Sequence, residues 1–151
     1  MMIRGVIGFI LSNIQVPLLI VAVIVTIVKL RRASARHEVM STTYTLWGEV
    51  LFYCFGLALV YAWYFHAFIA NQWELAWAEL GVGTVAMLSL WRGYDMRLAA
   101  TLASSICLFG AAAQHIHLVR LWFGDIALPL FTLFLAYGSR DAYERIVRRA
   151  Y

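Results

Sequence analysis

The fold is decided by a stretch near the middle of the chain that places charges beside a very short turn. Residues 70–83 read Ala70-Asn71-Gln72-Trp73-Glu74-Leu75-Ala76-Trp77-Ala78-Glu79-Leu80-Gly81-Val82-Gly83. Because the turn at residues 70–72 is so short, the apolar segments on its two sides must be antiparallel neighbours. The small residues that follow the turn allow two helices to approach closely. Two carboxylates in such an apolar segment must have either polar partners nearby or a functional role.

The composition places the chain among integral membrane proteins. Of its 151 residues, 64% are hydrophobic and 13% are charged, and the mean hydropathy is +0.79. Soluble domains are about half apolar and about a quarter charged. The apolar residues form runs of about 20, the length of a membrane-spanning helix, and not the short alternating segments of a barrel. We therefore expect an all-α, polytopic transmembrane helical bundle that forms a single domain over residues 1–151.

The apolar segments predict five membrane spans, at about residues 5–30, 44–70, 73–91, 98–119 and 123–138. Residues 139–151 are charged and are predicted to be a short cytoplasmic tail, able to form a surface helix. Ten of the 12 Lys and Arg residues fall on one side of these spans. Because positive charge is retained in the cytoplasm, the N-terminus is predicted outside and the C-terminus in the cytoplasm. The predicted location is the inner membrane of a bacterium, with the lipid bilayer as a partner.

Polar side chains gather in the outer half of this predicted bundle. At about 1.5 Å per residue, His66 and His115 lie roughly 6 Å from the outer ends of their spans, Glu79 roughly 9 Å and Asp125 roughly 5 Å. Glu74 lies at the mouth of the third span. Ionisable residues inside membranes are rare and usually face the bundle interior in pairs. The sequence therefore predicts an outer polar pocket with the ligand-binding residues Gln72, Glu74, Glu79, His66, His115 and Asp125.

Histidines and carboxylates from different helices are the groups from which metal sites in helical bundles are built. The predicted metal ligands are His66, Glu74 and His115, and the predicted ion is divalent. Haem b, held by the two histidines at similar depth, ranks below the divalent ion. The sequence names no catalytic residue and does not decide whether the protein is an enzyme.

Some of these residues also have structural interpretations. Glu74 would suit the N-terminus of its helix, where a carboxylate interacts favourably with the helix dipole. Asp125 would cap the fifth span, and His66 would be an interfacial histidine. In the inner half only Glu49 carries a charge, and it is either functional or a first-turn carboxylate.

Four short motifs occur in order between about residues 47 and 130. They are Gly48-Glu49 before Phe52-Tyr53, Gln72-Trp73-Glu74 with Ala78-Glu79-Leu80 and Gly83, a glycine-rich stretch from Gly110 to His115-Ile116, and Asp125-Ile126-Ala127-Leu128-Pro129. This order resembles a family of small bacterial multi-span membrane proteins of uncharacterised function. The family pattern has Asn at the position of Glu79, so the resemblance implies that Glu74 is the shared acidic residue. It implies the architecture without an activity.

The function expected from the sequence is therefore an outer-half pocket that binds a metal ion or a small ligand, and two alternatives stay open. One is a non-catalytic accessory or assembly subunit of a larger membrane complex or a homo-oligomer. The other is proton-coupled transport of a small solute. The chain has no phosphate-binding loop, dinucleotide motif or nucleophile elbow. Nucleic acid is not an expected partner, because topology explains the basic loops.

Overall fold

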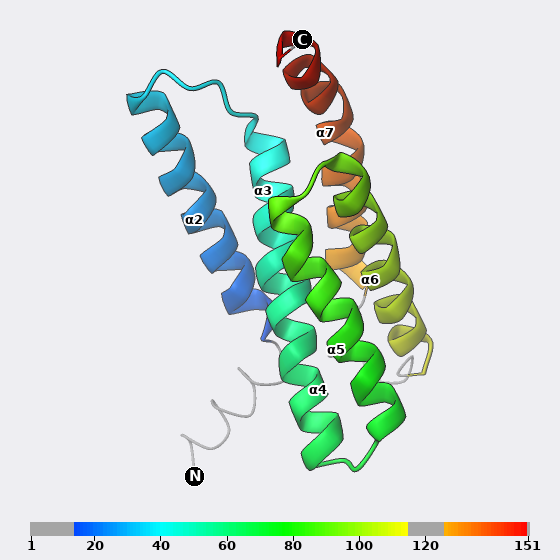
Figure 1. Cartoon of the computed structure of the whole chain (residues 1–151). Coiled ribbons are helices and arrows are strands. Elements are labelled where there is room, and N and C mark those ends of the chain that lie inside the picture. Colours follow the sequence, from blue (N-terminus) through cyan, green and yellow to red (C-terminus); the bar gives the residue numbers. More distant parts are fainter. Residues whose placement is uncertain (1–13, 115–125, 151) are drawn as a thin grey trace.

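The structure, a computed structural model, describes residues 14–114 and 126–150, and these residues form helices without any strand. In chain order the helices are α2 (Gln15–Ala35), α3 (Thr42–Val50), η1 (Leu51–Leu57), α4 (Ala58–Phe68), α5 (Trp73–Leu88), η2 (Ser89–Trp91), α6 (Tyr94–Gln114) and α7 (Leu128–Ala150). They pack side by side as a bundle (Figure 1). The all-α fold class expected from the composition is confirmed for this part of the chain.

The longest helix is continuous from Thr42 to Phe68 and includes α3, η1 and α4. Ser41 fixes its start, because the Ser41 hydroxyl accepts a hydrogen bond from the Tyr44 backbone N–H at 3.3 Å, which is the usual action of an N-cap serine. The helix has 27 residues and a mean hydropathy of 1.5. Among the residues the structure describes, it is the one helix that is long and apolar enough to cross a membrane. Its middle segment, η1, is π-helical.

The turn between α4 and α5 occupies residues 69–72 and makes these helices antiparallel neighbours (Figure 1). Asn71 has a φ of 54°, in the left-handed region that asparagine tolerates better than most residues. Further along the pair, a Cβ built on Gly83 would lie 3.0 Å from the Gly56 carbonyl oxygen. The backbones of η1 and α5 therefore approach closely at a position where a Cβ would be crowded, in agreement with the close packing expected of the small residues.

Two helices continue past the ends that hydropathy predicts. Span one was expected to end at about residue 30, and α2 continues to Ala35. Span five was expected to end at about residue 138, and α7 continues to Ala150. Residues 139–150 are therefore not a separate surface helix. Hydropathy locates the end of the apolar run, whereas Arg and Glu are good helix formers that extend the backbone hydrogen bonding beyond it.

The centre of the bundle lies around α3 and η1, which pack against α2, α5 and α7. Trp47, Val50, Leu51 and Phe55 are fully buried there. The Trp47 indole N–H donates to the Thr101 hydroxyl on α6 at 2.9 Å, so the largest side chain of the core has its polar atom satisfied.

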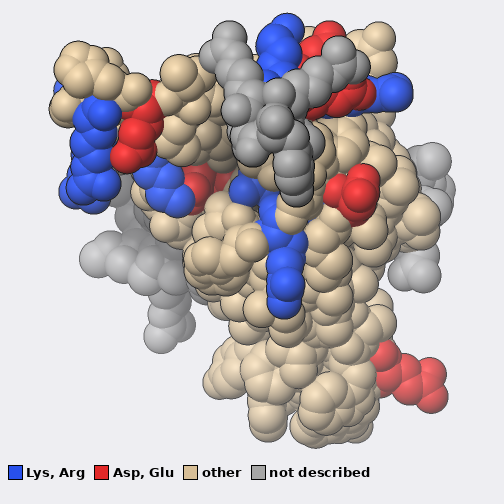
Figure 2. Space-filling view, turned by 45° about the horizontal axis from the view of Figure 1, so that its top comes forward, with Lys and Arg blue, Asp and Glu red and all other residues tan. Residues whose placement is uncertain are grey.

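The two ends of the bundle differ in charge. The loop after α2, the turn at η2 and the end of α7 lie together at one end, and the α4–α5 turn lies at the other (Figure 1). Among the described residues, all Lys and Arg belong to segments near the first end, which we call the basic end. Figure 2 shows that Lys and Arg gather toward this end, whereas most of the remaining surface is uncharged. The arrangement agrees with the charge asymmetry predicted from the loops.

Candidate functional site

His66 and Glu79 form a pair at the end of the bundle opposite the basic end. His66 lies in the last turn of α4 and Glu79 in the second turn of α5. The His66 Nδ1 and Glu79 Oε2 atoms are 2.7 Å apart. The Glu79 side chain is only 9% exposed, and that of His66 is 26% exposed. The pair therefore joins two helices and reaches the surface through the histidine.

The short turn positions this pair. The Gln72 backbone N–H donates to the His66 carbonyl oxygen at 2.8 Å, and the Ala76 N–H donates to the Gln72 carbonyl oxygen at 3.0 Å. The last turn of α4 is thereby tied to the first turn of α5. The Trp73 indole N–H donates to the Asn71 side-chain oxygen at 3.0 Å. This exposed hydrogen bond connects the turn to the first residue of α5.

The hydrogen bond to Glu79 orients the His66 ring. Which of the two atoms donates depends on the protonation of the pair. With Glu79 ionised and His66 neutral, the Nδ1–H group donates to the carboxylate and the lone pair is on Nε2. Among the described residues, no side chain or backbone group binds His66 Nε2. A carboxylate on one imidazole nitrogen is the usual support for a histidine whose other nitrogen binds a metal or transfers a proton. In that protonation state Nε2 is an acceptor that none of the described groups binds.

Gln72 and Glu74 do not join the pair. Both side chains are exposed, and Gln72 makes no side-chain cap at the start of α5. Glu74 lies in the first turn of α5, where a carboxylate suits the helix dipole. Five residues separate Glu74 from Glu79, which places them about 140° apart around the helix. Their side chains therefore face different directions.

The remaining predicted ligands, His115 and Asp125, lie outside the described residues. The predicted metal set of His66, Glu74 and His115, and the haem pair of His66 and His115, therefore fall partly outside them as well. Within residues 14–114 and 126–150, no group of three or more His, Cys, Asp or Glu side chains could hold a metal ion. The described part of the site is the His66–Glu79 pair.

A second side-chain pair, which is ionic, lies nearer the basic end and was not expected from the sequence. Lys29 Nζ on α2 lies 2.5 Å from Glu49 Oε1 on α3. The Glu49 side chain is only 3% exposed. The helix begins at Thr42, so Glu49 lies two turns inside it and the first-turn interpretation is wrong. The sequence held two signals for this pair: Glu49 is an isolated carboxylate, and Lys29 stands at the end of an apolar run. Their separation of 20 residues does not by itself predict that they meet.

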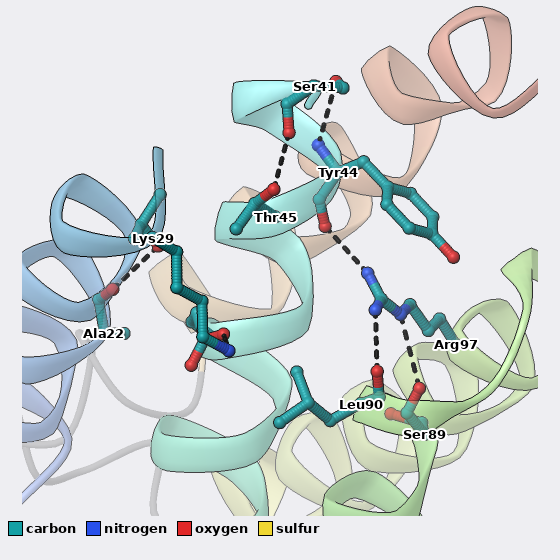
Figure 3. Close-up of polar contacts among 10 residues, drawn as sticks. Ala22, Lys29, Ser41, Tyr44, Thr45, Ser89, Leu90 and Arg97 are labelled. Carbon is teal, nitrogen blue, oxygen red and sulfur yellow. Dashed lines mark hydrogen bonds and ion pairs between the residues drawn. The ribbon is translucent and has the colours of Figure 1, made fainter. Parts of the chain in front are cut away.

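Arg97 is the other buried charge of this region (Figure 3). Its guanidinium donates to three backbone carbonyl oxygens, those of Tyr44 at 2.8 Å, Leu90 at 2.8 Å and Ser89 at 3.3 Å. Its Cζ lies 4.0 Å from the centroid of the Tyr44 ring, a cation–π distance. A Cβ on Gly48 would lie 2.9 Å from Arg97 Nη1. Arg97 thus fills a space left by glycine and connects α3, η2 and α6.

Aromatic rings complete the packing around Arg97. The Tyr143 ring stacks on Tyr44 at 5.9 Å and on Tyr94 at 5.5 Å, and Trp47 meets Tyr94 edge-on at 5.3 Å between centroids. The rings contact one another directly and Arg97 covers Tyr44. The cluster is therefore a structural connection among α3, α6 and α7, and the pair with a free nitrogen, His66–Glu79, is the candidate site.

Comparisons with known proteins bear on the family and not on the activity. Neither the curated proteins nor the solved structures gave a match to the chain. A family model described as a family of unknown function, DUF6790, matches residues 12–145. This range is longer at both ends than the 47–130 over which the motifs resemble an uncharacterised family. Because the match covers most of the sequence, the chain belongs to the DUF6790 family of unknown function.

Proposed function

We propose that the protein is a five-span membrane protein that binds a metal ion or a small polar ligand at its outer end through His66. Three observations support the membrane placement. The helix Thr42–Phe68 has the length and hydropathy of a span. The described helices follow one another in alternating directions across the bundle (Figure 1). The described Lys and Arg belong to segments near one end, which is then the cytoplasmic end.

The single observation that carries the ligand-binding proposal is the 2.7 Å contact between His66 Nδ1 and Glu79 Oε2. In the proposed membrane placement the contact joins two ionisable groups of membrane segments, and such groups are usually functional. With Glu79 ionised and His66 neutral, Nε2 is the atom that would meet the ligand. A divalent ion would bind the Nε2 lone pair together with water or further ligands, and a small polar ligand would donate a hydrogen bond to it.

Zinc is a suitable probe of this lone pair. Full-length protein in detergent is titrated with Zn²⁺, and binding is measured by calorimetry beside elemental analysis of the protein as purified. We expect one site in the unaltered protein, loss of that site in His66→Ala, and about 10- to 100-fold weaker binding in Glu79→Gln, because the carboxylate supports the ligating imidazole. His37, in the exposed loop after α2, provides the matched control His37→Ala. Unchanged zinc binding in His66→Ala would contradict the proposal.

The membrane placement has its own test. Alkaline phosphatase inserted at the Asn71 turn is expected to be active, and green fluorescent protein at the C-terminus is expected to fluoresce. The opposite pattern would show that the protein has the reverse orientation. Purification as a monomer without detergent would contradict the membrane placement itself.

A second candidate, an accessory subunit of a membrane complex, is favoured by one face of α5. Ala78, Gly81 and Thr84 are exposed at helical spacing, and a Cβ on Gly81 would meet nothing within 4 Å. Small residues on a membrane helix allow another helix to approach. Gly81→Leu is expected to abolish co-purification of any stoichiometric partner, whereas Glu38→Gln, in the exposed loop, is the control.

A further inference from the structure

Three arginines in and just after the last turns of α2 have exposed side chains. Among the described residues, the side chains of Arg31, Arg32 and Arg36 have no hydrogen bond or ion pair. By contrast, Arg140 on α7 pairs with Glu144 at 3.5 Å. Arg92 and Arg145 are also exposed, but they lie on separate segments. Among the described residues, the densest group of unpaired arginines is therefore the one at the end of α2.

The arginines continue a lipid-like surface along the same helix. Ile20, Ile24 and Ile27 are 56%, 54% and 46% exposed. With steps of four, three and four residues, Ile20, Ile24, Ile27 and Arg31 share one helix face. Arg31 lies about 16 Å along the axis from Ile20. This is close to half the thickness of a bilayer core of about 30 Å. The apolar face is therefore about as long as one leaflet is deep, and it ends at the positive charge of Arg31.

Packing of α2 keeps that face outward. The residues that α2 buries are Ala22, Thr26 and Ala33, and α2 packs against α3 and η1. Ala22 is two positions from both Ile20 and Ile24, which is about 200° around the helix. The Lys29–Glu49 contact lies on the buried side. This contact pairs the Lys29 charge with Glu49 and fixes the rotation of α2 about its axis. The three arginines therefore stay on the exposed side, where they can bind an anion.

We propose that this surface of α2 binds an anionic phospholipid of the cytoplasmic leaflet, with its phosphate on Arg31, Arg32 and Arg36 and an acyl chain along Ile20, Ile24 and Ile27. The guanidinium fork binds phosphate through two parallel hydrogen bonds, which an ammonium group does not reproduce. The inference rests on the membrane placement proposed above, but not on ligand binding by His66.

Native mass spectrometry of the full-length protein in detergent tests the inference, with phosphatidylglycerol and phosphatidylcholine as probes. Each cation near a membrane surface contributes about fivefold to the affinity for anionic lipid. We expect preferential binding of phosphatidylglycerol, and a loss of at least about tenfold in Arg31→Gln/Arg32→Gln/Arg36→Gln. The matched control Arg92→Gln/Arg140→Gln/Arg145→Gln removes the same charge from the same end and is expected to retain binding. The lysine triple at positions 31, 32 and 36 is expected to bind with intermediate affinity.

Three results would overturn the inference. Equal affinity for both lipids would remove the anionic selectivity, and equal losses in the two glutamine triples would make the attraction diffuse. Displacement of the lipid by millimolar inorganic phosphate would identify a phosphate site without a role for the acyl chain. Lipid binding in His66→Ala, measured in parallel, separates this inference from the proposed function, because that variant is expected to bind phosphatidylglycerol normally.

Discussion

Lys29 Nζ on α2 contacts Glu49 Oε1 on α3 at 2.5 Å, and the two side chains differ sharply in exposure. The lysine is 44% exposed, whereas the glutamate is 3% exposed. Lysine can turn to water when its partner is lost, but a carboxylate deep in the bundle has no such alternative. Removal of the lysine and removal of the glutamate should therefore lower the stability by different amounts.

This asymmetry predicts unequal effects of two substitutions. Lys29→Met leaves the buried Glu49 charge unpaired, and we expect a loss of about 2–3 kcal/mol, below the range for fully buried pairs because the lysine is half-exposed. Glu49→Gln is expected to cost less than half as much. Thermal unfolding in detergent measures both, and the double variant is expected to be more stable than Lys29→Met alone. A Glu49→Gln variant that is the less stable of the two would contradict this account.

The second prediction concerns the glycine beneath Arg97. A Cβ on Gly48 would lie 2.9 Å from Arg97 Nη1 and 3.0 Å from Leu90 Cδ1. Gly48→Ala must shift the guanidinium, which three carbonyl oxygens hold in place, and we expect a cost of about 1–3 kcal/mol, typical of overpacking. Gly81→Ala is the matched control, because nothing lies within 4 Å of its Cβ. The control is expected to be neutral or stabilising by up to about 1 kcal/mol, and similar destabilisation of both variants would refute the explanation.

The third prediction concerns the buried indole of Trp47. Thr101→Val keeps the shape of the side chain but removes the acceptor that Trp47 Nε1 uses at 2.9 Å. A buried donor without a partner costs about 1–3 kcal/mol. Thr84→Val removes an exposed hydroxyl that binds only its own helix, at the Leu80 carbonyl oxygen, so this variant is expected to unfold like the unaltered protein. Equal unfolding temperatures for the two variants would show that the Trp47 bond contributes nothing.

The fourth prediction concerns the tautomer of His66. With Glu79 ionised, the Nδ1–H form is expected, because that proton bridges the 2.7 Å contact. Nitrogen NMR of histidine-labelled protein reports the tautomer directly. Glu79→Ala is expected to shift His66 toward the Nε2–H form that dominates in free histidine, whereas Glu74→Ala is expected to leave it unchanged. A response to Glu74→Ala of the same size would mean that the carboxylate of Glu74, and not only that of Glu79, reaches the histidine.

The sequence predicted the helices well because apolar runs and a short turn are local properties. Each end of the Thr42–Phe68 helix lies within two residues of the end of the predicted span. The shortness of the α4–α5 turn was enough to predict that the two helices are antiparallel neighbours. Helix ends were predicted less well. Charged residues continue α7 to Ala150 although the apolar run stops earlier.

The candidate site was predicted only in part because side-chain direction depends on rotation about each helix. His66 and Glu79 come together, whereas Glu74 faces elsewhere. The 140° between the two glutamates could have been read from their spacing. The contacts of Glu49 with Lys29 and of Arg97 with Tyr44 could not, since these partners lie 20 and 53 residues away in the chain.

The π-helical segment η1 has a consequence for how substitutions act along the longest helix. A π-turn holds one more residue than an α-turn, so η1 sets the rotation between the two halves of the helix. Deletion of one residue within Leu51–Leu57 would let this segment close as an ordinary α-helix and would keep the rotation of α4 relative to α3. Insertion of one further residue would instead turn α4 by about 100° relative to α3. Glu49 would then keep Lys29, while His66 would turn away from Glu79. The π-helical segment therefore separates the two ends of the bundle, so that a change of length within it affects the His66–Glu79 pair and leaves the Lys29–Glu49 pair in place.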